Sequence, residues 1–292
     1  MRVWHRPVIS RSFKVLAIVV AVAVPVITLP RLPALDLWPA LAGLLIWTVG
    51  KYLLCPLRWR GLSDSGRGTG WHVGAYAESE LLGLLTPGHV GADLWRIKRL
   101  TGVGMARGSA AAEVTLDRLV GAIGLTLFVG LAGAALPVRL LLGVLGLAAV
   151  LVAAMLLVRR VRPHWIPRRE WPTPGRLARG LVLSVAYQAS IIALLFGALL
   201  ATGHTTNPLA VLAAFGASQL AGVVPGPHGA SPRDAALAVA LVGFGVPWTA
   251  ALGAVALKAL LAWAPALLLG GGALLLAGRW HEASAVRRGS SA

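Results

Sequence analysis

Long apolar runs occupy much of this chain and restrict the folds open to it. The clearest runs span residues 15–29, 140–158, 181–200 and 249–277. Each is long enough, or nearly so, to cross a hydrocarbon core of about 30 Å. Because backbone polar groups must be paired inside a bilayer, such runs predict helices. The sequence therefore predicts an all-α, polytopic integral membrane protein, with one membrane domain over residues 1–292 and no room for a soluble catalytic domain.

The net charge of +17 is gathered in clusters. Most of the 27 Lys and Arg residues lie at 2–14, 58–67, 96–107, 159–179 and 279–288. The loops expected at 30–37 and 202–208 hold a single basic residue, Arg31. This asymmetry follows the positive-inside rule and predicts a multi-pass protein of the bacterial inner membrane with both termini cytoplasmic. It argues against a nucleic-acid partner, which would need a solvated basic face, and favours anionic membrane lipids.

The sequence offers no motif of an enzyme. The lone Cys55 excludes an internal disulfide and any multi-cysteine metal site. Nucleotide-binding loops, nucleophile elbows and His-Glu metal motifs are absent from the sequence. We therefore expect no cofactor, no metal and no catalytic residue, although the sequence leaves open whether the protein is an enzyme.

One unusual hexapeptide, P-G-x-x-G-A, occurs twice, at residues 87–92 and 225–230. Helix breakers inside apolar segments, at matching places in two halves of a chain, indicate the binding site of a transporter. The residues that this motif nominates for substrate binding are Pro87, Gly88, Gly91, Pro225, Gly226 and Gly229.

The positive-inside rule turns these segments into a topology. A crossing segment at 71–86 would put the bases near residue 99 outside, so we expect a re-entrant hairpin that returns by that point. A second broken hairpin, at 209–246, enters from the opposite side. The full spans are expected at 13–29, 34–54, 109–131, 140–158, 177–201 and 248–277. We thus predict about six full spans plus two broken hairpins, about eight membrane segments, as an inverted repeat of halves at about 1–135 and 136–278, before a cytoplasmic tail at 279–292.

Charged residues near the breaks complete the predicted site. Arg96 and Arg233 adjoin the two breaks, where free backbone amides and helix ends can receive an anion. Arg118 and Lys258 follow the breaks at matching distances and would add central positive charge. We expect three acids, Asp93, Asp117 and Asp234, to orient these bases or compete with substrate for them. A pair such as Asp117–Arg118 would alternatively only hold helices together.

Three segments carry a resemblance to a known family. They are L-L-G-L-L-T-P-G-H-V-G-A-D-L-W-R at 81–96, T-L-D-R-L at 115–119 and V-P-G-P-H-G-A-S-P-R-D-A-A-L at 224–237. The chain resembles the flippase-like transmembrane domain of lysylphosphatidylglycerol synthases in its stand-alone form. The resemblance implies movement of lipids or lipid-linked head groups across the cytoplasmic membrane. The family's synthase activity resides in a separate cytosolic domain, so we do not expect it here.

The sequence therefore predicts a flippase, a transporter that translocates an anionic lipid or lipid-linked head group. A membrane-embedded transferase acting on a lipid carrier is one alternative, and a non-transporting cell-envelope scaffold is another. A small-solute transporter is a closer variant of the first hypothesis. A homodimer or a cell-envelope enzyme as partner also stays open.

Overall fold

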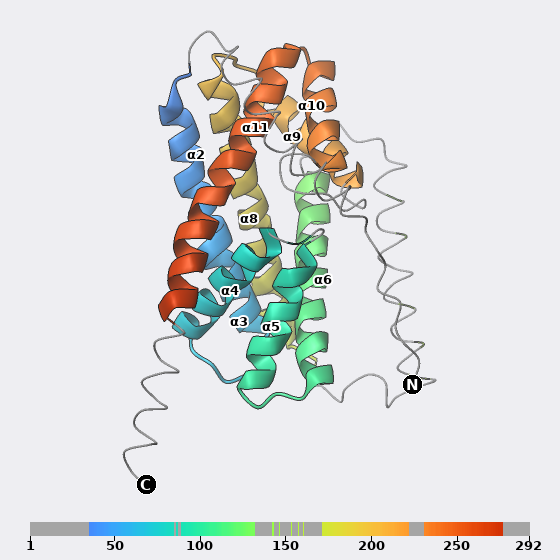
Figure 1. The fold of residues 1–292 in the computed structure, drawn as a ribbon. Coiled ribbons are helices and arrows are strands. Elements are labelled where there is room, and N and C mark those ends of the chain that lie inside the picture. The colour runs from blue at the N-terminus through green and yellow to red at the C-terminus, as the bar shows by residue number, and fades with distance from the viewer. Residues whose placement is uncertain are drawn as a thin grey trace, which may run out of the picture.

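The protein is a bundle of helices in a computed structural model (Figure 1). The structure describes residues 35–84, 86, 89–131, 142, 146, 153, 157, 160, 171–221 and 231–276. Within these residues the regular elements are all helical, without a strand, as the apolar runs predict. The helix expected at 13–29, the tail at 279–292 and most of the helix expected at 140–158 lie outside the described residues.

The described helices follow one another with short connections. In chain order they are α2 (Leu37–Val49), the π-helical turn η2 (Gly50–Leu54), α3 (Cys55–Leu62), α4 (Thr69–Leu84), α5 (Val90–Gly102), α6 (Arg107–Leu131), α8 (Pro174–Ala201), α9 (Pro208–Ala221), α10 (Pro232–Gly243), α11 (Trp248–Pro265) and the π-helical turn η4 (Ala266–Gly270).

Three of the described helices are long and apolar enough to cross a membrane, which supports the prediction of an integral membrane protein. They are the continuous segment Leu37–Leu62, the helix α8, and the segment Trp248–Leu276. The second and third match the spans expected at 177–201 and 248–277. Helix α6 matches the element expected at 109–131 but carries four charged residues in its first half, Arg107, Glu113, Asp117 and Arg118.

The first of these segments corrects the sequence prediction. The helix expected to end at residue 54 continues through η2 into α3, as one segment of 26 residues. Pro56 does not stop it: the proline lies inside the segment, just after the π-helical turn Gly50–Leu54, and the helix continues through it. Lys51 therefore lies in the middle of the segment, and Arg58 lies on a helix where the sequence predicted a cytoplasmic loop.

Close packing of small residues joins α2 to α8. A Cβ atom added at Gly43 would lie only 2.6 Å from the carbonyl oxygen of Ala193. Glycine therefore lets the two backbones approach, which is how helices associate where lipid weakens the hydrophobic drive. The same face continues into a core in which α8, α9, α10 and α11 bury apolar residues against one another.

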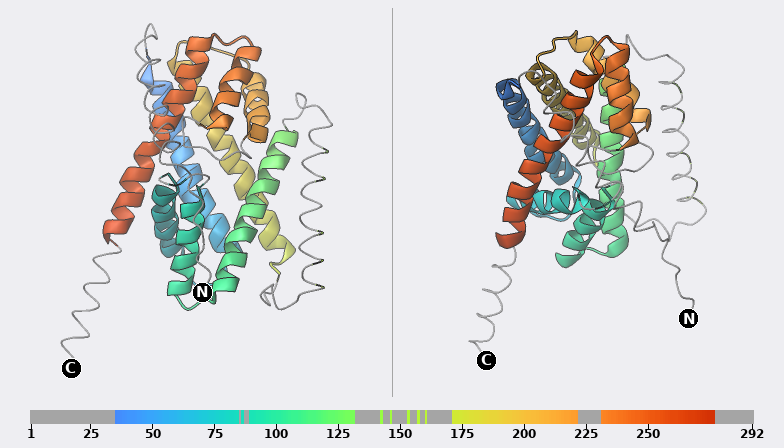
Figure 2. Two further views of the ribbon diagram at one scale, coloured as in Figure 1. Left: turned by 45° about the vertical axis from the view of Figure 1, so that its right-hand side comes forward. Right: turned by 45° about the horizontal axis from the view of Figure 1, so that its top comes forward.

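Two pairs of short helices form hairpins within this bundle. Helices α4 and α5 pack together around the connection at 85–89, and α9 packs against α10 across residues 222–231. In Figures 1 and 2 the first hairpin lies at one end of the bundle and the second at the opposite end, and in each the helix ends that flank the connection are directed toward the middle. They occupy the segments where the sequence predicted broken hairpins, at 71–99 and 209–246.

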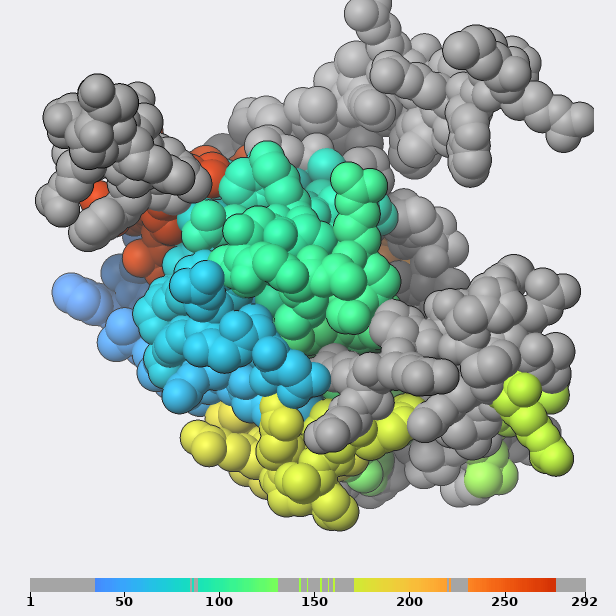
Figure 3. Space-filling model, turned by 90° about the horizontal axis from the view of Figure 1, so that it is seen from below, coloured from blue at the N-terminus to red at the C-terminus, as the bar shows by residue number. Residues whose placement is uncertain are grey.

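Several connecting segments lie together at the end of the bundle that carries the α5–α6 connection. Seen from below, the segment after α3 lies beside the start of α8, next to the α5–α6 connection (Figure 3). Arg176 joins them: its Nε donates to the carbonyl oxygen of Gly61 at 2.6 Å, and its Nη2 to that of Ser63 at 2.9 Å. This base from a predicted cytoplasmic cluster thus holds two segments together at one end.

Candidate functional site

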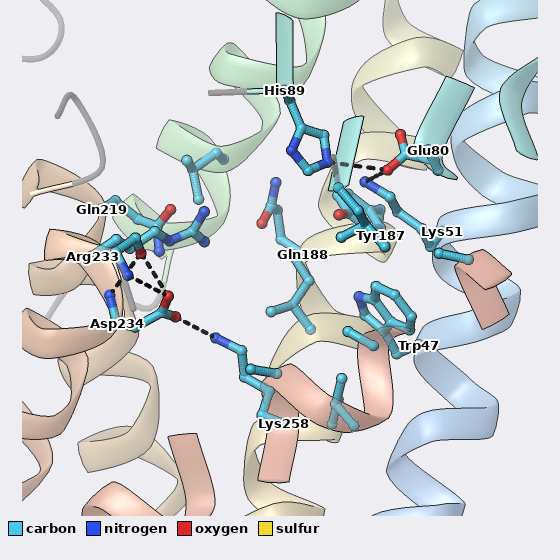
Figure 4. Close-up of a pocket in the computed structure, with 18 of the residues that line it drawn as sticks. Trp47, Lys51, Glu80, His89, Tyr187, Gln188, Gln219, Arg233, Asp234 and Lys258 are labelled. Carbon is cyan, nitrogen blue, oxygen red and sulfur yellow. Dashed lines mark hydrogen bonds and ion pairs between the residues drawn. The ribbon is translucent and has the colours of Figure 1, made fainter. Parts of the chain in front are cut away.

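A cavity of about 440 Å³ lies between the two hairpins (Figure 4). Helices α2, η2, α6, α8, α11 and η4 complete its wall. The hairpins contribute Glu80, Leu84 and His89 from α4–α5, and Gln219, Ser231, Arg233 and Asp234 from α9–α10. Residues that flank both predicted breaks therefore share one cavity, although the breaks are more than a hundred residues apart in the sequence.

Positive charge exceeds negative charge in the wall of this cavity. The bases are Lys51, Arg118, Arg233 and Lys258, and the carboxylates are Glu80 and Asp234. Charges of one sign that line a cleft with low-dielectric walls focus their field into it. The arrangement favours an anion as the ligand.

Arg233 is the base best placed to bind an added anion. In the part of the chain that the structure describes, no carboxylate lies within ion-pair distance of its guanidinium. Its charged group instead lies over the ring of Phe215, 5.5 Å from the centroid. Arg233 also stands in the first turn of α10, where the helix dipole favours negative charge. The lack of a carboxylate partner leaves the guanidinium available to a ligand in the cavity. The start of α10 adds to the attraction of this position for an anion.

Asp234 supports the start of α10 and also faces Lys258. Its Oδ2 accepts hydrogen bonds from the backbone N–H and the hydroxyl of Ser231, at 3.3 and 2.6 Å. Ser231 Oγ in turn accepts from the N–H of Asp234 at 3.2 Å, which completes a capping box. The other carboxylate oxygen is 3.6 Å from Lys258 Nζ. Because this ion pair is long, an anion can compete for Lys258 without removing the cap.

Glu80 joins the first hairpin, α4–α5, to the segment Leu37–Leu62. Its Oε2 lies 2.8 Å from Lys51 Nζ and 3.3 Å from His89 Nε2. Its Oε1 lies 3.6 Å from Arg96 Nη2. Figure 4 shows Lys51, Glu80 and His89 together on one side of the cavity, with Arg233 and Asp234 on the other. The carboxylate thus compensates bases on its own side, and the uncompensated charge lies across the cavity.

Asp93 and Arg118 link α5 to α6 at the edge of the site. Arg118 donates from Nε to Asp93 Oδ1 at 2.9 Å, and its Nη2 lies 2.8 Å from the same oxygen. The Asp93 side chain is 33% exposed and the Arg118 side chain is 45% exposed. Asp93 therefore holds a base that lines the cavity, which is the orienting role that the sequence suggested for it.

The sequence predicted Arg96 as a direct contact to the anion, but the structure places it outside the cavity wall. The residue is 1% exposed. Its Nη1 donates to Asp117 Oδ2 at 3.0 Å, and its guanidinium lies 4.1 Å from the Tyr76 ring centroid. The structure thus brings Arg118, Arg233 and Lys258 to the cavity but not Arg96.

Asp117 is the centre of a buried ion-pair network. It is fully buried and accepts from Arg58 Nε and Nη2 at 2.7 and 3.1 Å, in addition to Arg96. Arg58 also donates to Ser184 Oγ at 3.0 Å, which extends the network to α8. These contacts favour the alternative in which Asp117 holds helices together. Its partners are Arg58 and Arg96, in place of the expected Arg118.

The predicted glycine and proline contacts have a different outcome. Pro87, Gly88, Pro225, Gly226 and Gly229 lie outside the described residues. Gly91 is described, and its N–H donates to Thr86 Oγ1 at 2.8 Å. A Cβ there would lie 2.6 Å from the same hydroxyl oxygen, so glycine is required by the tight packing of the turn. In this structure Gly91 shapes the hairpin and offers no free amide to a ligand.

The wall residues that sequence reasoning missed include Lys51, Glu80 and Gln188. Lys51 stood at the end of a predicted helix, where a base is ordinary. Glu80 lies seven residues before Pro87, where the predicted break begins, and was not assigned to the site. A signal for both was present, because a lone acid and a lone base inside apolar segments usually pair. Gln188, in the middle of the α8 span, is a polar residue of the kind that faces a bundle interior.

Comparison with known proteins gives no family. No family model, curated protein or solved structure matches this chain. Among the described residues there is also no group of three or more His, Cys, Asp or Glu side chains arranged to hold a metal ion. The argument for function therefore depends on the cavity itself.

Proposed function

We propose that this protein binds the head group of an anionic lipid in the cavity and moves it across the bacterial inner membrane. The observation that carries the proposal is Arg233, a partly buried arginine without a carboxylate partner in the described chain, in a cavity wall with more bases than acids. Unpaired charge is costly away from water and usually marks a substrate path in membrane proteins. Arginine's planar fork suits phosphate oxygens.

The cavity volume favours a head group as the occupant. A volume of about 440 Å³ lies within the roughly 300–1,000 Å³ typical of small-molecule sites. In the proposed mechanism, phosphate binds between Arg233, Lys258 and Arg118 while the acyl chains stay in the bilayer. Arg96 acts indirectly, since through Asp117 and Glu80 it positions the first hairpin.

The proposal extends to the membrane arrangement. We place about eight segments in the membrane, six full spans and two re-entrant hairpins, as an inverted repeat of halves at about 1–135 and 136–278. The opposite ends from which α4–α5 and α9–α10 reach the middle support this arrangement. Such symmetry provides the two related states needed for alternating access. The end that carries the α5–α6 connection faces the cytoplasm, because the basic clusters gather there.

The resemblance to the flippase-like domain of lysylphosphatidylglycerol synthases belongs to the same proposal. The short helices and the shared cavity at the two P-G segments are consistent with it. A membrane-embedded transferase would show turnover in detergent, without a second compartment. A scaffold would tolerate neutralisation of the cavity bases.

The test is the variant Arg233→Gln, which keeps length and donors but removes the charge. Loss of a hydrogen bond to a charged group should weaken anionic-lipid binding by about 1.5–3 kcal/mol, and transport in proteoliposomes should fall with it. The matched control is Arg107→Gln, an exposed arginine at the start of α6, which should leave both unchanged. Binding and transport by Arg233→Gln equal to the parent would show that the cavity is not the lipid site.

A further inference from the structure

Gln188 is a buried polar residue that faces the cavity without a partner. It lines the cavity from α8 and is only 7% exposed. Within the described part of the chain its side-chain amide makes no hydrogen bond. In the view of Figure 4 it is drawn between Arg233 and Gln219 on one side and Tyr187 and Lys51 on the other.

Three polar side chains near Gln188, those of Ser184, Ser190 and Gln219, are hydrogen-bonded within the protein, and Gln188 differs from them. Ser184 Oγ donates to the carbonyl oxygen of Gly180 at 3.0 Å, and Ser190 Oγ to that of Tyr187 at 2.6 Å. On the facing wall, Gln219 Nε2 donates to the Phe215 carbonyl oxygen at 3.0 Å. The amide atoms of Gln188 are not among the side-chain atoms of the described chain that are both fully buried and without a hydrogen-bond partner, so they open onto the cavity. A ligand there can supply the hydrogen bonds that the described protein does not.

We propose that Gln188 selects a lipid whose phosphate carries a hydroxyl-bearing substituent, such as glycerol or a sugar. An amide both donates and accepts, and so does a hydroxyl, whereas an ammonium or a carboxylate does only one. The ligand would place its phosphate at Arg233 and its hydroxyl at Gln188. This inference rests on the proposed function and specifies which anionic lipids the site prefers.

The experiment compares lipids that differ only in these hydroxyls. Phosphatidylglycerol and phosphatidylpropanol have the same charge and, with matched acyl chains, differ by the head-group hydroxyls. Binding to the purified full chain is measured by native mass spectrometry and thermal shift. The parent should prefer phosphatidylglycerol. Phosphatidylinositol tests the sugar-like source of the same chemistry, and glycerol 1-phosphate tests a free ligand without acyl chains.

The variant Gln188→Leu should lower affinity for phosphatidylglycerol roughly 2- to 12-fold, the loss expected for one neutral hydrogen bond. Affinity for phosphatidylpropanol should not change, which separates recognition from a folding defect. Gln219→Leu serves as the comparison, because its amide nitrogen already bonds within α9, and it should reduce the preference less.

The two proposals fail in different ways. If the parent binds both lipids equally, or if Gln188→Leu keeps the parent's preference, the selectivity inference is wrong while anionic-lipid transport stands. If neither lipid binds better than a zwitterionic lipid, the proposed function is wrong. Glycerol 1-phosphate binding as tightly as the lipid would identify a soluble polyol phosphate as the ligand and overturn the lipid part of the inference.

Discussion

Replacing Asp117 with Asn should destabilise the fold more than any neutralisation at the cavity edge. Asp117 is fully buried and accepts three hydrogen bonds from Arg58 and Arg96, whose side chains are 7% and 1% exposed. Asparagine keeps the shape but leaves the buried guanidinium of Arg58 without its counter-charge, and Arg96 with only the more distant carboxylate of Glu80, at 3.6 Å. Breaking a buried ion pair in this way costs about 3–5 kcal/mol, a large part of the roughly 5–15 kcal/mol that stabilises a typical domain.

The matched control is Asp93→Asn, which removes an acid of the same type from a pair one helix away. Asp93 and Arg118 are 33% and 45% exposed, so solvent screens them and the loss should be about 0–1 kcal/mol. Both free energies of unfolding are measured by denaturant titration in the same detergent. Equal losses for the two variants would refute the claim that Asp117, Arg58 and Arg96 are buried to stabilise the fold.

Two further predictions concern packing and topology. Gly43→Ala should destabilise the fold by about 1–3 kcal/mol, because the added Cβ would meet the α8 backbone at 2.6 Å. Gly74→Ala is the control: a Cβ there would have nothing within 4 Å, so this change should be neutral or stabilising in the same unfolding assay. Equal effects of the two changes would contradict the close contact of α2 with α8. In a Cys55→Ser background, cysteine at Thr101 should react only with reagent from the cytoplasm and cysteine at His204 only from outside, and labelling of both from one side would exclude the opposed hairpins.

The sequence predicted those parts of the fold that depend on local chemistry. Apolar runs of membrane-spanning length become α8 and the segment Trp248–Leu276. The two segments rich in proline and glycine, 87–91 and 225–229, fall where α4 ends and α5 begins and where α9 ends and α10 begins. These features could be predicted because span length and helix breaking are properties of a few neighbouring residues.

Ion-pair partners could not be predicted in the same way. Asp117 is next to Arg118 in sequence, yet successive side chains on a helix point in different directions. Its partners come instead from α3 and α5, which only the packing of the bundle brings near. Arg96 was assigned to the anion site because it follows a break, but the rotation of α5 directs it toward α6. The unpartnered amide of Gln188 likewise needed the three-dimensional structure.

The π-helical turn Gly50–Leu54 has a consequence for how insertions and deletions would affect this protein. A π turn contains one residue more than the α-helical turn it replaces, so it acts as a local insertion that the helix absorbs. Deleting a residue there would let the segment rewind as plain α-helix and keep its hydrogen bonds. Because the wide turn already absorbs its extra residue, such a deletion would leave α2 and α3 in nearly their present relation. The same deletion within α2 or α3 would instead rotate one half of the segment against the other by about 100°, the angle of one residue at 3.6 residues per turn. The turn is therefore the place in this segment where a change of length least disturbs the face of α2 that meets α8 and the ion pairs that Arg58 makes from α3.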